Sequence, residues 1–241
     1  MYKAEWNGKF VAVKKFEGTY NLKNRESFKK ELDILSQIDC QNVVKVFGFH
    51  LERENTYIVS ELMEGGSLDS LLHNASIPLN WKDALVLING MVSGMVYLHD
   101  KNIVHLDLKS PNILLDQEKK QAKIADFGLA KISNTMSTTV KVSEIATRQK
   151  TAAGTFRWMS PEVSKGKEGV KKSDVWSFGC MLLEFVTRAL PFRSITNVQA
   201  VYLMLQTDKA EIPINLDVSK TPKVIGWLIE KCLKRDANSR L

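Results

Sequence analysis

The chain has 241 residues, of which 44% are hydrophobic and 25% are charged. This length suits one large domain or two small lobes, and the composition is that of a soluble globular protein, which argues against intrinsic disorder. The 34 basic and 27 acidic side chains give a net charge of +7, but Lys and Arg are scattered and form no basic run. We therefore do not expect nucleic acid or an anionic membrane as a partner, whereas phosphate-bearing small molecules remain compatible with this surface.

The cysteines and the N-terminus indicate the compartment. Cys40, Cys180 and Cys232 are odd in number, far apart and outside any metal-binding pattern, so we expect neither a disulfide framework nor a zinc site. The first residues carry charges where a signal peptide is apolar, and no apolar run approaches the ~20 residues that a membrane span needs. These features predict a cytoplasmic protein in a reducing environment, with no membrane span. They do not indicate an oligomeric state.

The first sixty residues are predicted to be rich in strands, with one helix. Strands are expected at 2–6 and 9–13, joined by a turn at Asn7-Gly8, a dipeptide that readily adopts positive φ in hairpins. Residues 24–38 carry apolar side chains at helical spacing, among them Phe28, Leu32 and Leu35. Two further strands are expected at 43–49 and 56–60.

Residues 64–67, Glu-Gly-Gly-Ser, form the expected boundary between two lobes, and beyond them the pattern becomes helical. Residues 80–83 resemble a capping box that opens a long helix. Helices are expected at 174–187 and 196–206, and a third beginning with Thr221 as the N-cap and Pro222 as the first helical residue. Residues 131–153 are polar and without period, which is typical of a functional or disordered loop. The chain contains no internal repeat.

The segment 103–115 carries the clearest chemical pattern. Two short apolar strands, 103–104 and 113–115, flank His105, Asp107, Lys109 and Asn112. Pro111 is expected to exclude a helix between them, so that the polar residues lie on a loop, where catalytic groups are common. Asp107 could accept a proton from an attacking hydroxyl, and the amide oxygen of Asn112 could bind a metal ion.

Other residues support the same chemistry less strongly. Lys14 lies on an inward-facing strand and could pair with Glu31, which follows seventeen positions later; the alternative is two solvated surface charges. Asp126 follows a strand expected at 121–124 and could bind Mg²⁺ together with Asn112, although Asp-Phe-Gly is also an ordinary turn sequence. Glu162 and Arg240 could form a buried bidentate ion pair.

The order of these residues is more specific than any one of them. It resembles the signature set of protein kinases, here formed by Lys14, Glu31, Asp107, Asn112, Asp126, Glu162, Asp174 and Arg240. Residues 105–112 and 154–162 look most like the tyrosine kinase-like group, the Raf and mixed-lineage relatives. The resemblance implies an α+β, bilobal protein kinase fold over 1–241, with a small antiparallel β-sheet lobe containing one helix (1–60), a hinge (61–66) and a larger, mainly helical lobe (67–241).

The resemblance also implies roles for individual residues. Lys14 would hold the ATP phosphates and would pair with Glu31. Asp126 and Asn112 would bind Mg²⁺. Asp107 would deprotonate the acceptor hydroxyl, and Lys109 would steady the γ-phosphate. Residues around the adenine would be Ala12 and Leu114 on its two faces, Ser60 as gatekeeper, and the backbone of Glu61 and Met63. Asp174 would support the stacked residues that align the lobes. Lys109 and Thr155 favour protein substrates with Ser or Thr acceptors, and dual specificity stays open.

Two departures from the pattern matter. No G-x-G-x-x-G occurs in the chain, and it stops just after Arg240, so relative to the family it reads as shortened at both ends. Leu106 replaces the Arg that pairs with a phosphate on the activation loop, so we expect activity not to depend on phosphorylation, at Thr151 for example, through this residue. Two functions therefore remain: an active kinase, or a pseudokinase that binds nucleotide or partners with little catalysis.

Overall fold

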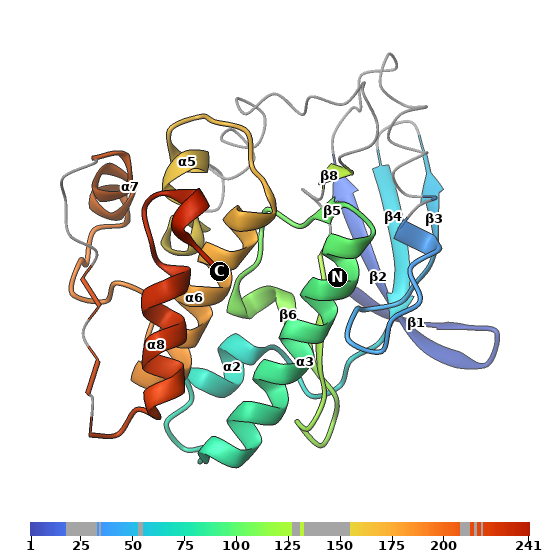
Figure 1. Cartoon of the computed structure of the whole chain (residues 1–241). Coiled ribbons are helices and arrows are strands. Elements are labelled where there is room, and N and C mark those ends of the chain that lie inside the picture. The colour runs from blue at the N-terminus through green and yellow to red at the C-terminus, as the bar shows by residue number, and fades with distance from the viewer. Residues whose placement is uncertain are drawn as a thin grey trace.

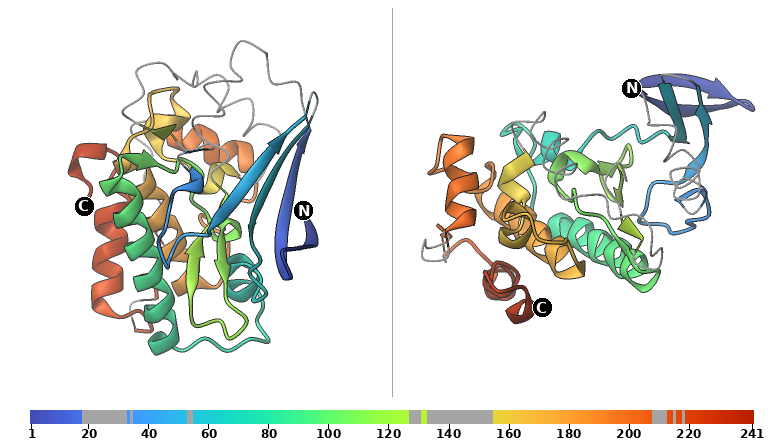
Figure 2. Two further views of the ribbon diagram at one scale, coloured as in Figure 1. Left: turned by 90° about the vertical axis from the view of Figure 1, so that its right-hand side faces the viewer. Right: turned by 90° about the horizontal axis from the view of Figure 1, so that it is seen from above.

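The computed structural model describes residues 1–17, 33, 35–52, 55–126, 131–132, 155–207, 213–214, 216–217 and 219–241 (Figure 1). Strands form the first part of the chain and helices dominate the rest. In Figure 2 the first four strands stand as one sheet beside the helical part. The predicted α+β architecture, with an N-terminal antiparallel sheet and a helical C-terminal part, is confirmed.

The N-terminal sheet has four antiparallel strands in the order β1-β2-β4-β3: β1 (Tyr2–Trp6), β2 (Lys9–Glu17), β3 (Val46–Leu51) and β4 (Asn55–Glu61). Asn7 and Gly8, both at positive φ, make the predicted tight turn between β1 and β2. β2 runs further than expected because it pairs with β4 as far as Glu17. β3 begins later than expected, since Val43 forms only an isolated bridge to Ile124.

The helix expected at 24–38 falls mostly outside the described residues. Within it, Asp33, Leu35 and Ser36 are helical, and Leu35 and Ile38 are buried. Glu31 lies outside the described residues.

The C-terminal part is built from six helices among the described residues: α2 (Leu68–Leu72), α3 (Trp81–Asp100), α5 (Pro161–Ser164), α6 (Lys171–Thr187), α7 (Val198–Gln206) and α8 (Lys223–Cys232). α6 is almost wholly buried and packs against α8 (Figure 1). α3 begins at the predicted N-cap: the Asn80 side chain accepts a hydrogen bond from the Asp83 N–H at 2.9 Å. Asp83 returns the contact to the Asn80 side-chain amide and not to its backbone.

Three helix starts differ from the prediction. α6 begins at Lys171, before Asp174, because Ser173 Oγ accepts from the N–H of Val170 and extends the first turn backwards. α7 begins at Val198 after an Asn197 cap. The prediction that Thr221 caps α8 is wrong: its hydroxyl donates to the Asp217 carbonyl instead, and Pro222 becomes the N-cap.

Short elements surround the polar segment 103–115. β5 (Ile103–Val104) pairs with β8 (Lys131–Ile132), and β6 (Ile113–Leu115) pairs with β7 (Ala122–Ile124). β8 lies at the start of the stretch predicted to be a loop, so that prediction is wrong at its first two residues. Ser110–Asn112 form a 3₁₀ turn, η2, rather than an irregular loop, because Pro111 sits in a first turn, where a missing N–H leaves no bond unmade. A second turn, η3 (Thr155–Trp158), precedes α5, and η4 (Ala237–Ser239) follows α8.

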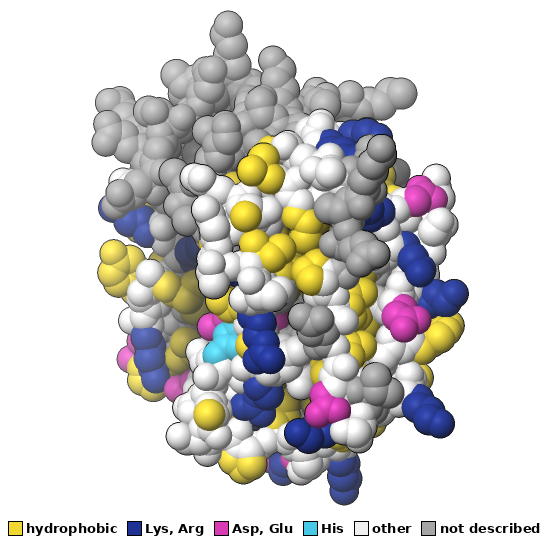
Figure 3. Space-filling view, turned by 90° about the vertical axis from the view of Figure 1, so that its left-hand side faces the viewer, with side chains coloured by type: hydrophobic (Ala, Val, Ile, Leu, Met, Phe, Trp, Pro, Cys, Tyr) yellow, Lys and Arg dark blue, Asp and Glu magenta, His cyan; other side chains and the backbone are white. Residues whose placement is uncertain are grey.

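The described surface fits the scattered charge seen in the sequence. On the face drawn in Figure 3, basic side chains are interspersed with apolar and acidic ones. Each helix in the described part of the chain is too short or too polar to cross a bilayer.

Candidate active site

The structure brings together Lys14 and Asp126, which are 112 positions apart in the chain. Lys14 Nζ, on β2, lies 2.5 Å from Asp126 Oδ2, just after β7. Each side chain is 31% exposed, so the pair is shielded yet reachable from solvent. Ala12, two positions before Lys14, is buried. The predicted pairing of Lys14 with Glu31 lies outside the described residues and stays a prediction.

Asp126 is placed next to the polar loop by its neighbour Ala125. The Ala125 N–H donates to the Asn112 carbonyl at 2.8 Å, and its carbonyl lies 2.9 Å from His105 Nε2. The other ring nitrogen of His105, Nδ1, accepts from the Asp107 N–H at 3.2 Å. These two contacts assign the neutral tautomer with its proton on Nε2. His105 therefore ties the loop with Asp107 to the end of the strand that carries Asp126.

Asp107 has one occupied and one open carboxylate oxygen. Its Oδ2 accepts from Asn112 Nδ2 at 3.0 Å and lies 3.0 Å from Lys109 Nζ. Its Oδ1 is buried and has no hydrogen-bond partner among the described residues. A buried carboxylate oxygen without a donor is costly, and a substrate hydroxyl would satisfy it. Asp107 is thus held in place by its neighbours with one atom left to accept a proton.

Asp174 of α6 holds this loop through hydrogen bonds to its backbone. Its carboxylate is buried and accepts from the backbone N–H groups of His105 and Leu106, each at 2.9 Å. His99 Nε2 lies 2.8 Å from the same carboxylate. Leu106 has a positive φ of 65°, and its side chain is buried against Gly169. A Cβ on Gly169 would lie 2.3 Å from Leu106 Cδ2, so the leucine fits because position 169 has no side chain.

The segment that joins the two parts of the chain is bonded to β6. The N–H of Gly65 donates to the Leu115 carbonyl at 3.0 Å, and the Leu115 N–H donates to Gly66 at 2.9 Å. Between these contacts, Leu114 forms a bridge to Ser67. Leu114 on β6, one of the two positions predicted to enclose an adenine, is thus adjacent to this connection.

The predicted gatekeeper and hinge residues lie in or just after β4. Ser60 pairs with Ala12 across the sheet. The Glu61 N–H donates to Lys45, and its carboxylate binds Lys123 Nζ at 2.7 and 2.9 Å. Glu61 therefore has its side chain and its N–H engaged within the protein. Met63 follows in the connection.

Asn112 and Asp126 offer oxygen atoms that suit a divalent cation. Both hydrogen bonds of the Asn112 side chain leave from Nδ2, to the carbonyl and the carboxylate of Asp107, so Oδ1 is its ligand atom. The Asp126 carboxylate adds a second hard oxygen donor. Oxygen donors of this kind, with phosphate oxygens, are what Mg²⁺ prefers. The residues present fit Mg²⁺.

Glu162 of α5 and Arg240, which follows η4, form a buried ion pair. The Arg240 side chain has no exposed surface, and its two terminal nitrogens lie 2.8 and 2.7 Å from the two Glu162 oxygens. Burial alone raises the pKa of Glu162, but the Arg240 hydrogen bonds and charge and the Ser173 hydroxyl outweigh burial and hold this pKa below its ordinary value. Thr155 begins η3, and Thr151 lies outside the described residues.

A group of three hydrogen-bonded residues, Glu184, Ser110 and Trp158, was missed by sequence reasoning. Glu184 of α6 is fully buried and accepts from Ser110 Oγ at 2.6 Å and from Trp158 Nε1 at 2.7 Å. Ser110 and Trp158 stand inside the recognised stretches 105–112 and 154–162, so their positions carried a signal. Glu184 carried none, because one glutamate in an apolar helix has no pattern of its own.

Comparison with known proteins agrees with this geometry. The family described as "Protein kinase domain" matches residues 1–241. Serine/threonine-protein kinase CTR1 of Arabidopsis thaliana is 36% identical over 238 residues, which cover 96% of this chain and 27% of that protein. MAP3K epsilon protein kinase 1 of the same organism is 30% identical over 237 residues, 97% of this chain and 16% of that protein. The chain thus spans about a quarter or less of the length of these relatives. It belongs to the protein kinase family.

Proposed function

We propose that this chain is the catalytic domain of a serine/threonine protein kinase that transfers the γ-phosphoryl group of Mg-ATP to protein hydroxyls. The observation that carries the proposal is the arrangement around Ala125. One residue of this segment bonds to Asn112 and His105, and the next, Asp126, pairs with Lys14. The Lys14 ammonium, two carboxylates (Asp107 and Asp126) and the Asn112 amide thus come together from three separate segments, as phosphoryl transfer requires. We assign the small lobe to 1–60, the hinge to 61–66 and the large lobe to 67–241.

In this reaction the acceptor hydroxyl oxygen forms a bond to the γ-phosphorus while the bond to the β–γ bridging oxygen breaks and ADP leaves. Asp107 Oδ1 takes the hydroxyl proton, since its other oxygen is held by Asn112 and Lys109. Lys109 lies beside this carboxylate, where its ammonium meets the charge of the transferring group. Asn112 and Asp126 would hold Mg²⁺, which neutralises phosphate charge when bound.

Lys14 positions the nucleotide. Its ammonium lies against Asp126 in the described structure and would contact the α- and β-phosphates when ATP binds. Ala12 and Leu114 would enclose the adenine between β2 and β6, with Ser60 at its edge and backbone groups of Glu61 and Met63 toward it. The Ser/Thr-kinase names of the relatives, together with Lys109 and Thr155, favour Ser/Thr acceptors.

A second function, a nucleotide-binding scaffold without transferase activity, is favoured by Leu106, which stands where the family has Arg. Five residues expected at the ATP and metal site favour catalysis instead: Lys14, Glu31, Asp107, Asn112 and Asp126. A scaffold would not need Asp107 as a proton acceptor.

The test is Mg-ATP-dependent phosphorylation of casein by the wild type, by Asp107→Asn and by Asp100→Asn. Asp100 is exposed at the end of α3, so it undergoes the same chemical change away from the site. We expect Asp107→Asn to lower kcat by about 10²–10⁴-fold, the usual contribution of a general base, and Asp100→Asn to match the wild type. Mg-ATP binding without turnover in the wild type would contradict the kinase proposal and support the scaffold.

A further inference from the structure

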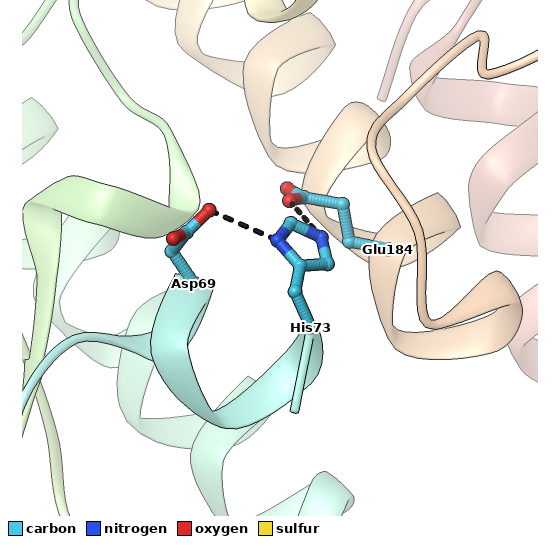
Figure 4. Close-up of side chains that lie close together, drawn as sticks. All are labelled: Asp69, His73 and Glu184. Atoms are coloured by element: carbon cyan, nitrogen blue, oxygen red, sulfur yellow. Dashed lines mark ion pairs between the residues drawn. The ribbon is translucent and has the colours of Figure 1, made fainter. Parts of the chain in front are cut away.

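A cluster of titratable side chains contacts residues 103–115, the segment that carries Asp107 and is here called the catalytic loop, and has no role in the reaction described above. It consists of Asp69 and His73 of α2 and Glu184 of α6, here called the histidine cluster (Figure 4). His73 Nδ1 lies 3.0 Å from Asp69 Oδ1, and His73 Nε2 lies 3.3 Å from Glu184 Oε1. Figure 4 shows the imidazole between the two carboxylates, with one ring nitrogen toward each. A ring that carries two protons and a positive charge attracts both carboxylates, and Nε2 meets Glu184 as an ion pair rather than as an aligned hydrogen bond.

Glu184 connects this cluster to the catalytic loop and to the segment before α5. Its Oε1 accepts from Ser110 Oγ, its Oε2 accepts from Trp158 Nε1, and its side chain has no exposed surface. Ser110 is the residue after Lys109 and two before Asn112. A charged carboxylate at such depth is stable only when donors and an opposite charge surround it.

The other ionisable groups around the cluster do not supply that charge. Arg188, at the end of α6, donates to the carbonyl oxygens of Leu71 and Leu72 at the end of α2, not to Glu184. Cys180, one turn earlier on α6, is neutral because burial holds the pKa of its thiol well above the ordinary value. Among the described groups that contact Glu184, the positive charge is that of His73.

We propose that His73, as an imidazolium, is a positioning residue that holds the catalytic loop through Glu184 and Ser110, so that phosphoryl transfer falls when His73 loses its proton. The proposal rests on the proposed kinase function, because Ser110 lies within the loop that carries Asp107. Within the described part of the chain the cluster lies on α2 and α6 and bonds to Ser110 and Trp158, not to Lys14 or Asp126, so we expect the effect on the reacting geometry rather than on nucleotide affinity.

The direction of the pH dependence follows from the charges. The nearby Glu184 carboxylate is the largest cause that raises the pKa of His73 above its ordinary 6.5; burial opposes it, and Asp69 adds to it. A group whose pKa is raised by folding stabilises the fold fully below its unfolded pKa and loses that contribution as pH rises through its folded pKa. The His73 contribution is therefore complete below about pH 6.5 and is lost as pH rises through the raised pKa of the folded protein. Burial also raises the pKa of Glu184, against its three donors, which acts in the same direction from about pH 4.5 upwards.

The test uses the whole chain with two substitutions and a matched control. His73→Asn removes the charge at every pH, whereas His73→Lys keeps a cation up to about pH 10. His50→Asn is the control, because His50 is 69% exposed and contacts Glu52 at the surface of the sheet. We measure kcat and the KM for ATP from pH 6 to 9, and follow the His73 ring proton by NMR over the same range.

We expect the NMR midpoint of His73 to lie above 6.5 and the wild-type kcat to fall about tenfold across it, within the ~100-fold that a 1 Å misplacement costs. His73→Asn should have the low kcat at every pH and His73→Lys a high, flat profile. The KM for ATP should not change, and His50→Asn should follow the wild type.

Three results would overturn the proposal. The first is a fall in the kcat of His73→Lys at alkaline pH equal to that of the wild type, and the second is an NMR midpoint of His73 at or below 6.5. The third is stoichiometric zinc in the wild type that His73→Asn lacks, which would make the cluster a metal site. If the wild type transfers no phosphate at any pH, the proposed function has failed separately. The link between His73 and Glu184 is then decided by the NMR titration and by the melting temperature, which should fall more steeply from pH 6.5 to 9 in the wild type than in His73→Asn.

Discussion

The close contact between α3 and the backbone before Asp126 makes a sharp prediction for Gly94→Ala. A Cβ on Gly94 would lie 2.6 Å from the Asn42 carbonyl oxygen and 2.9 Å from Ile124 Cδ1. That carbonyl already accepts a hydrogen bond from the Ile124 N–H at 2.9 Å, so it cannot move alone. Ile124 is the last residue of β7, two before Asp126. The added methyl must therefore push α3 away from the strand that places Asp126.

The magnitude follows from two opposing effects. Alanine in a helix interior is better than glycine by about 1 kcal/mol. Ordinary contact begins near 3.4 Å, so the methyl needs about 0.8 Å of extra space, and overpacking a tight interface costs about 1–3 kcal/mol. Because the obstacle is hydrogen-bonded backbone, we take the upper part of that range. Gly94→Ala should then destabilise the protein by about 1–2 kcal/mol.

The assay is urea unfolding, with Gly226→Ala as the matched control. Gly226 is also inside a helix, α8, but among the described residues the nearest atom to its Cβ would be Leu216 Cδ1, at 4.0 Å. The same substitution should therefore stabilise the protein there, by about 0.5–1 kcal/mol. Gly94→Ala should in addition weaken Mg-ATP binding, since Asp126 moves. A Gly94→Ala protein as stable as the wild type would refute the reasoning.

Two further predictions concern the buried ion pair. Arg240→Ala leaves the Glu162 carboxylate without its cation and should lower the free energy of unfolding by about 3–5 kcal/mol, which is roughly 6–20 °C in melting temperature. The control is Lys45→Ala, which breaks the exposed pair with Asp39 and should cost about 0–1 kcal/mol. The pKa of Glu162 is held below its ordinary 4.5, so the pair stabilises the fold above that pH and loses this contribution as pH falls through the folded pKa. On acidification below pH 4.5, the melting temperature of the wild type should therefore drop more steeply than that of Arg240→Ala.

Local pattern was sufficient wherever one short-range cause decides a structure. Asn7-Gly8 fixes a hairpin because both residues accept positive φ, and Asn80 opens α3 because its side chain satisfies an N–H of the first turn. The pairing of Lys14 with Asp126 is different, because nothing in 112 residues of separation specifies it. The order of the motifs, which resembles that of a known family, predicted one shared site for Lys14 and Asp126, but it predicted Glu31 and not Asp126 as the direct partner of Lys14.

Elements that depend on distant partners escaped the sequence. α2 and α5 are five and four residues long, too short for any period to show. β8 exists because β5 offers it a partner across the polar segment. Glu184 looks like any glutamate on a helix, and only its donors from the catalytic loop and from η3 explain why it is buried. In each case the cause is a contact between segments far apart in the chain.

Leucine at position 106 changes the chemistry of the catalytic loop but not its course. A positive φ costs a non-glycine residue about 1–3 kcal/mol, so something must hold Leu106 there. Asp174 does so, by accepting from two consecutive N–H groups, and the side chain is buried where Gly169 leaves room for it. An arginine would need a partner for its charge at this place, whereas leucine needs only contact. The loop is thus held by a buried carboxylate and by packing, and Asp107 keeps its position without a cation next to it in the chain.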